Sequence, residues 1–138
     1  MRNLPVSGMK SSAVPYISVR WLALLAICAA YLQGGGVKLF DFSSAVAEMQ
    51  HFGLSPAAPM AAAVIVLELG ASLLILSGRY RWLGAIALGI FTLAANFMAN
   101  NFWAISGPER AMVMNGFFEH VGLVGAFAYV AWQDLREE

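Results

Sequence analysis

Seven polar side chains that could bind a ligand or move a proton stand in otherwise apolar stretches of this sequence. Glu68 is the most unusual, because the surrounding run VIVLELGASLLIL contains only Val, Ile, Leu, Ala, Gly and Ser besides it. A charged side chain at the centre of a membrane helix costs about 2.5–3.5 kcal/mol on insertion scales, so a function is expected to retain it. The seven residues are Lys38, Glu68, Asn96, Asn100, Asn115, Glu119 and His120.

Glu68 and Glu119 are the two candidates for proton transfer. One protonated and one ionised carboxyl group would suit proton exchange with a quinone or another small redox-active substrate, with Lys38 as the charge partner. The single cysteine, Cys28, fits no metal-ligand spacing, and the sequence contains no CxxC, haem, iron–sulfur, dinucleotide-binding or P-loop motif. Electron transfer would therefore need a bound cofactor or a redox partner protein.

The composition predicts that lipid surrounds these residues. Hydrophobic residues make up 60% of the 138 positions and charged residues 12%, whereas soluble domains are about half apolar and about a quarter charged. The formal net charge is zero and basic residues form no cluster, which argues against a nucleic-acid partner. The predicted class is an all-α integral membrane protein.

Four apolar stretches are each long enough to cross a hydrocarbon core of about 30 Å as a helix. They predict a bundle of four antiparallel transmembrane helices between two cytoplasmic tails. A cleaved signal peptide is rejected for the first stretch, because its apolar character continues past any cleavage point. The predicted tails are residues 1–18 and 133–138, and the predicted spans, within a domain of residues 19–132, are residues 19–39, 59–76, 82–105 and 112–132.

The basic residues predict the orientation of the bundle. With both termini inside, six of the eight basic residues lie on the cytoplasmic side, and only Lys38 and Arg110 lie on the other side. The positive-inside rule favours this N-in, C-in arrangement. The four tryptophans fall near the ends of the spans, where aromatic belts form.

The first outer loop, residues 41–59, is predicted to contain a short amphipathic helix. Its apolar residues recur at helical spacing, whereas the polar residues of the same stretch occupy other faces. Two interpretations are open: a lid that shields the ends of the helices, or a gate over a pocket. The apolar positions are Phe42, Ala45, Val46, Met49 and Phe52.

Counting residues from the span ends places Glu68 about 15 Å deep, near the bilayer midplane. The other polar residues fall in the outer halves of the spans, where Asn96 shares a helix face with Asn100, and Asn115 with Glu119. Lipid cannot solvate such groups, so they should face the interior. We therefore expect an outward-facing polar pocket with Glu68 at its floor. Its walls would comprise Lys38, Asn96, Asn100, Asn115, Glu119 and His120.

Structural roles for the same residues stay open. Intramembrane asparagines often join helices by hydrogen bonds worth about 0.6–2 kcal/mol. Lys38 could extend its ammonium group to the lipid headgroups. His120 could serve packing rather than ligand binding.

Three motifs, in this order, carry a resemblance to a known family. GGGVKLFD is followed after a short loop by HFGLSP and then by LELGASLLILSGRYRWLG. These motifs resemble the DoxX family of small four-helix membrane proteins over about residues 20–132. The resemblance implies that Lys38 and Glu68 are site residues.

Related proteins include the quinone-reducing subunits of thiosulfate:quinone oxidoreductase and membrane components of redox complexes with superoxide dismutase and a sulfurtransferase. The resemblance thus implies an oxidoreductase subunit that binds a quinone and works with other protein subunits. One span departs from the family pattern, because members often carry a histidine where this chain has ANFMANNFW. Asn96 and Asn100 cannot exchange protons at ordinary pH, which leaves Glu119 and His120 to compensate.

A rival interpretation is an accessory subunit without catalytic activity that packs against a larger membrane complex. Its polar residues would join helices, and its Gly and Ala faces would be docking surfaces. A small transporter ranks below both interpretations, because polar residues at one end of the bundle provide no path through it.

Overall fold

The computed structural model describes the backbone of residues 13–137 and the side chains of residues 19–137. Residues 1–12 of the predicted cytoplasmic tail lie outside this range, and residues 13–18 belong to the first helix. The described residues are helical throughout apart from the turns and contain no strand, which confirms the predicted all-α class. The elements in chain order are α1 (Ala13–Phe40), α2 (Phe42–His51), α3 (Ala57–Ser77), α4 (Arg81–Ala99), η1 (Phe102–Ala104) and α5 (Arg110–Glu137).

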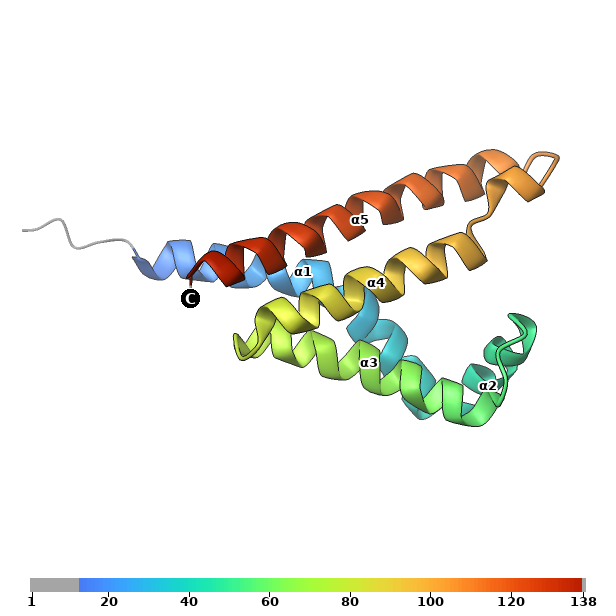
Figure 1. Cartoon of the computed structure of the whole chain (residues 1–138), viewed down its shortest axis with the longest axis horizontal. Coiled ribbons are helices and arrows are strands. Elements are labelled where there is room, and N and C mark those ends of the chain that lie inside the picture. The colour runs from blue at the N-terminus through green and yellow to red at the C-terminus, as the bar shows by residue number, and fades with distance from the viewer. Residues whose placement is uncertain (1–12, 138) are drawn as a thin grey trace, which may run out of the picture.

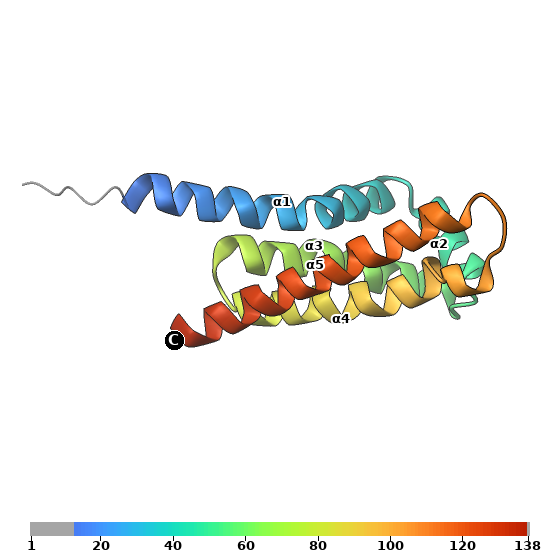
Figure 2. The ribbon, with the colours of Figure 1, turned by 90° about the horizontal axis from the view of Figure 1, so that it is seen from above.

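Four of these helices are long and apolar enough to span a membrane, as predicted. The helices α1, α3, α4 and α5 run up and down beside one another, and both described ends of the chain lie at the same end of the bundle (Figures 1 and 2). Neighbours pack in the order α1, α3, α4, α5. The short helix α2 lies at the opposite end beside α3, and we call this end the α2 end (Figure 1).

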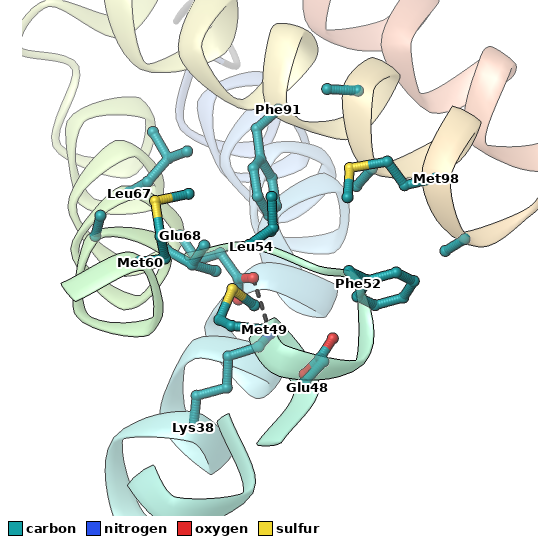
Figure 3. Close-up of a pocket in the computed structure, with 15 residues that line it drawn as sticks. Lys38, Glu48, Met49, Phe52, Leu54, Met60, Leu67, Glu68, Phe91 and Met98 are labelled. Atoms are coloured by element: carbon teal, nitrogen blue, oxygen red, sulfur yellow. Dashed lines mark hydrogen bonds and ion pairs between the residues drawn. The ribbon is translucent and has the colours of Figure 1, made fainter. Parts of the chain in front are cut away.

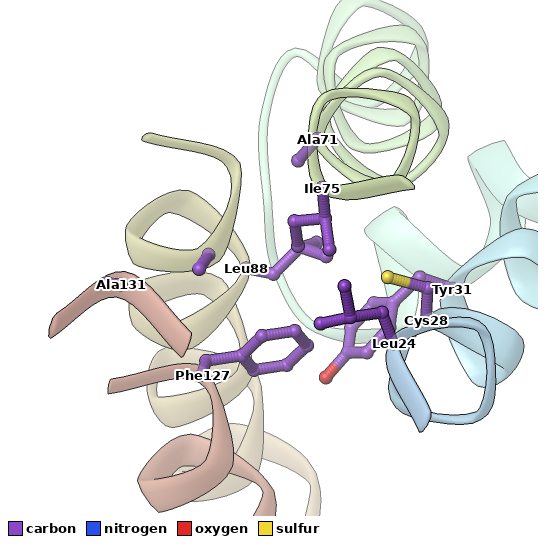
Figure 4. Close-up of a cluster of buried hydrophobic side chains, with 9 residues drawn as sticks. Leu24, Cys28, Tyr31, Ala71, Ile75, Leu88, Phe127 and Ala131 are labelled. Atoms are coloured by element: carbon purple, nitrogen blue, oxygen red, sulfur yellow. The ribbon is translucent and has the colours of Figure 1, made fainter. Parts of the chain in front are cut away.

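The main apolar core joins all four long helices. Leu24, Cys28 and Tyr31 of α1 meet Ile75 of α3 and Leu88 of α4, and α5 contributes Phe127 and Ala131 (Figure 4). The rings of Tyr31 and Phe127 contact edge to face with centroids 5.5 Å apart, and the Tyr31 hydroxyl hydrogen-bonds Thr92 of α4. Towards the α2 end, α5 and α3 diverge (Figure 1). The space beside α4 at that end is where the hollows described below occur.

The turn between α3 and α4 is as tight as the sequence Gly78–Arg81 predicts. Gly78 ends α3 at φ +80°, a conformation in which glycine avoids the steric penalty of a side chain, and its N–H bonds to the Leu74 carbonyl. Just after this turn α3 and α4 pack closely. A Cβ at Gly84 of α4 would lie only 2.6 Å from the carbonyl oxygen of Ala71 in α3. The absent side chain therefore sets the distance between α3 and α4.

The helix of the third span ends before the predicted residue 105, although the apolar span itself continues through the next turn to Ala104. Helix α4 stops at Ala99, and Asn100 caps it by bonding its N–H to the Asn96 carbonyl. Asparagine side chains compete with helical hydrogen bonds and favour helix ends, which explains the early stop. A 3₁₀ turn follows, and its Phe102 and Trp103 pack against Phe117 of α5. The last helix is longer than predicted, since it continues to Glu137 through the expected tail.

The amphipathic helix predicted in the first loop is α2. Ala45 and Met49 are buried on its inner face against Ala61 and Val64 of α3. Asp41 begins the helix, because its carboxylate accepts hydrogen bonds from the Ser44 N–H at 3.3 Å and from the Ser44 hydroxyl at 2.8 Å. Such a cap satisfies backbone donors that the first helical turn leaves free.

Helix α2 should depend on the charge of Asp41. Hydrogen bonds from the Ser44 hydroxyl and N–H and from the Ser43 hydroxyl hold the pKa of Asp41 below its usual value. Because the pKa is lower in the folded protein, the stabilisation is present at neutral pH and is lost as the pH falls through that lowered value. We expect Asp41→Ala to melt at a lower temperature than wild type at pH 7, and this difference to shrink in acid. The asparagine side chain of Asp41→Asn can still cap the helix but does not titrate, so this contribution to its melting temperature should not change with pH. A difference in melting temperature between wild type and Asp41→Ala that stays the same at the lowest pH would contradict this account.

The contact at Gly84 should be sensitive to a single methyl group. Gly84→Ala would push the new Cβ into the Ala71 carbonyl, and overpacking of this kind costs about 1–3 kcal/mol. The matched control is Gly70→Ala on α3, where nothing lies within 4 Å of the added Cβ. Thermal unfolding in detergent should show a lower melting temperature for Gly84→Ala than for Gly70→Ala. Equal melting temperatures would mean that α3 and α4 do not pack this closely.

Candidate ligand-binding site

The centre of the site is an ion pair between α1 and α3. Lys38 Nζ, in the last turn of α1, donates a hydrogen bond to Glu68 Oε1 at 2.9 Å, and the two side chains are 17% and 5% exposed. At this burial each charge depends on the other, because desolvating an isolated charge costs several kcal/mol. The structure thus brings together the two residues that the family resemblance singled out.

Two glycines of the GGG run allow α1 to approach Glu68. A Cβ at Gly34 would lie 3.2 Å from Glu68 Oε2, and a Cβ at Gly35 would lie 2.8 Å from Leu69 Cδ2. A side chain at either position would require the side chains of α3 to shift or the two helices to move apart. Gly34 and Gly35 therefore permit the close approach of α1 to α3.

The ion pair leaves hydrogen-bonding capacity unused. Glu68 Oε2 is buried and has no hydrogen-bond partner among the described residues. An ammonium group carries three N–H donors, and Glu68 is the only partner of Lys38 in the described part of the chain. A bound molecule could therefore receive hydrogen bonds from Lys38 and donate one to Glu68.

A pocket of about 500 Å³ opens beside this pair, between α2, α3 and α4. Its size lies within the usual range for small-molecule sites. Phe91 of α4 projects into it, and methionines from three elements surround it (Figure 3). Methionine adapts its shape and contacts aromatic rings favourably, so these walls suit a flat apolar ligand. The apolar lining consists of Met49, Phe52, Leu54, Met60, Ala63, Val64, Leu67, Phe91, Ala94, Ala95, Met98 and Ala99, and the charged lining of Lys38, Glu48 and Glu68.

A second, smaller hollow of about 180 Å³ lies on the other side of the ion pair, between α1, α4 and α5. Its lining is more polar and includes Asn96, Asn100 and His120. Asn96 Nδ2 donates to the Phe117 carbonyl of α5 at 3.0 Å, and Asn100 Nδ2 donates to Asn96 Oδ1 at 2.9 Å. Asn96 thus also joins α4 to α5, which is the structural role that stayed open for it.

The predicted single polar pocket is divided in the structure. Lys38 and Glu68 line both hollows, whereas Asn96, Asn100 and His120 line only the second one. Asn115 and Glu119 are exposed and line neither hollow. The reason is the rotation of α5. The face of α5 towards the second hollow carries Leu123 and the exposed His120, and Phe127 continues it into the core. Asn115 and Glu119 are turned about 100° away from their neighbours on this face, as is usual for adjacent helix positions.

Several lining residues were not expected from the sequence. Tyr31 and Thr92 stand at the second hollow, Glu48 reaches the larger pocket from α2, and Met60 and Met98 form walls of that pocket. Tyrosine, threonine and methionine are ordinary in apolar helices, so their types carried no signal. The helical spacing of α2 did indicate Met49 as part of an inward face, but not what that face covers.

The ion pair should show strong energetic coupling. Lys38→Met or Glu68→Leu alone leaves the remaining charge buried without a partner, which costs about 3–5 kcal/mol for buried pairs. The double variant removes both charges and should recover most of that loss. Melting temperatures of the two single variants, the double variant and wild type form a double-mutant cycle. If the decrease in melting temperature of the double variant equals the sum of the decreases of the two single variants, the two charges are not coupled as their geometry requires.

Comparison with known proteins identifies the family of this chain. The sequence pattern of the DoxX family matches residues 20–101, which is more than half of the chain. The chain is 28% identical over 112 residues to the inner membrane protein YphA of Escherichia coli (strain K12), which covers 80% of this chain and 79% of that protein. No solved structure matches the chain. With its four membrane-length helices, this protein is a multi-pass inner-membrane protein that belongs to the DoxX family.

Proposed function

We propose that this protein is a subunit of a membrane redox system and binds a quinone, or a similar small redox-active molecule, in the 500 Å³ pocket. The observation that carries the proposal is a buried ion pair with free hydrogen-bonding groups beside an apolar pocket of ligand size. A quinone has the matching chemistry, because it is a flat apolar ring with polar oxygens at its edge. Its hydroquinone form adds hydroxyl donors.

Each side chain of the pair has a distinct role in this proposal. Lys38 donates a hydrogen bond to a ring carbonyl oxygen, and Glu68 exchanges a proton with the same ring when its redox state changes. Reduction of the quinone takes up two electrons and two protons. The electrons come from a partner subunit or its substrate, because neither Lys38 nor Glu68 changes oxidation state.

The rim of the pocket supports entry of an apolar ligand from the bilayer. Ala63 of α3 and Ala94 and Met98 of α4 line the pocket and are also exposed. In a membrane these side chains face the acyl chains, in which lipid-soluble quinones reside. With the N-in, C-in orientation that the basic residues favour, the α2 end and the pocket belong to the outer half of the membrane.

A thermal-shift titration of the purified protein with a short-chain quinone tests the proposal. A ligand that binds only the folded state stabilises it by mass action and so raises the melting temperature. At a ligand concentration of a hundred times Kd, the stabilisation is about 2.7 kcal/mol. We expect wild type to shift. We also expect Glu68→Gln, which preserves the shape of the side chain, to shift much less while remaining folded. Glu119→Gln is the matched control, since its carboxylate is exposed and lines neither hollow.

One observation favours a second candidate function, that of an accessory subunit in a larger membrane complex. Asn115 and Glu119 are exposed on a span, where lipid cannot solvate them, so a protein partner would stabilise them. The same titration separates the two functions. A wild type that does not shift with the quinone favours the accessory subunit. Some loss of stability in Glu68→Gln is expected under both functions, because it leaves the Lys38 charge without its partner, so the quinone-dependent shift decides between them.

A further inference from the structure

Glu68 lies between two hollows of different character. The larger pocket is almost entirely apolar around the ion pair, whereas the smaller hollow is lined by hydroxyl, amide and imidazole groups. Helix α4 forms the partition, because Phe91, Ala95 and Ala99 line both hollows. Glu68 therefore stands between the two hollows and lines both of them.

The unpartnered oxygen of Glu68 lies on the side of the smaller hollow. Gly34 lines this hollow and not the larger pocket. A Cβ at Gly34 would be 3.2 Å from Glu68 Oε2. Because Gly34 has no side chain, no side-chain atom of this residue separates the hollow from the buried Oε2. A buried carboxylate oxygen without a partner in the described chain normally binds an ordered water.

The smaller hollow has the size and the polar groups to hold water. About 180 Å³ accommodates several molecules, since each occupies about 30 Å³ in the liquid. His120 Nδ1 must donate its hydrogen to the Gly116 carbonyl, which can only accept, so the neutral ring has a bare Nε2 that can take a proton. The titratable side chains around the hollow are Tyr31, Lys38, Glu68 and His120.

We propose that the smaller hollow is a hydrated path that supplies protons to Glu68 Oε2, separate from the pocket that binds the redox ligand. This inference deepens the proposed function. When a bound quinone gains two electrons from the redox partner, a proton from bulk water crosses the water of the hollow to the ionised Glu68, and Glu68 passes it to a ring oxygen. A second proton follows the same route to the other ring oxygen. His120 Nε2 can accept a proton from bulk water and pass it on, and oxidation of the hydroquinone runs the same transfers in reverse.

Two neighbouring alanines provide a matched test of hydration. Ala29 and Ala30 are the middle residues of the 22-residue span Val19–Phe40, and both are exposed. Only Ala30 lines the smaller hollow, and Ala29 lines neither hollow. Each is changed to cysteine in a Cys28→Ala background, which removes the buried native thiol. The variants are reconstituted in lipid vesicles and treated with silver ion and with a small charged methanethiosulfonate.

Ala30→Cys is expected to react at least about tenfold faster than Ala29→Cys, because apolar surroundings keep a thiol protonated and each pKa unit changes the thiolate fraction tenfold. Full labelling of both variants in denaturing detergent confirms that both thiols are present. If both positions are unreactive in vesicles, the hollow is dry and the inference is overturned. If both react equally, water reaches this face of α1 without the hollow, which also overturns it.

A second measurement tests whether the path is separate from the ligand pocket. Labelled Ala30→Cys is titrated with the short-chain quinone, and its melting temperature should still rise as in the unlabelled variant. Loss of the shift only after labelling would show that both hollows form one ligand site and would overturn the separation. If wild type itself shows no shift, the proposed function fails, whereas the labelling contrast still decides whether the hollow is hydrated.

Discussion

The buried ion pair between Lys38 and Glu68 is the interaction on which the rest of the site depends. Two opposite charges at 2.9 Å compensate each other in surroundings that would not tolerate either one alone. The pair requires close contact between α1 and α3, and Gly34 and Gly35 permit that contact because a Cβ at either position would meet the side chains of α3. The same close contact between α1 and α3 therefore both packs the helices and forms the ion pair.

The remainder of the bundle places helix α4 next to this ion pair, where it separates the two hollows. The main core closes the end of the bundle that holds the termini, through Tyr31, Leu88 and Phe127 among others. At the α2 end, α4 stands between the two hollows, and α2 covers the larger one with Met49 and Phe52. The outcome is a single carboxyl group with an apolar side and a polar side. Proton-coupled chemistry on an apolar ligand needs this combination.

The polar residues of α4 and α5 divide into those that hold the bundle together and those that face outward. Asn96 spans from α4 to the backbone of α5, and Asn100 in turn bonds Asn96, so both are tied into the structure. Asn115 and Glu119 point away from both hollows. Asn96 and Asn100 therefore hold helices together, whereas Asn115 and Glu119 lie on the exposed surface of α5.

The sequence by itself determined the four membrane-length helices and the amphipathic helix, and it singled out Lys38 and Glu68 as candidate site residues. The length and apolar composition of a stretch and the charges within it can be read directly from the sequence. In a bilayer, length and composition decide whether a helix spans, and a charge within a span is costly enough to stand out. Only the tertiary structure decided that the polar residues line two hollows and that Glu119 lies outside both. The rotation of α5 about its axis depends on which residues pack against α4, and a helix with apolar residues on every side does not reveal this. The end of α4 at Ala99 was hidden for a similar reason, because an asparagine can either continue an apolar helix or cap it.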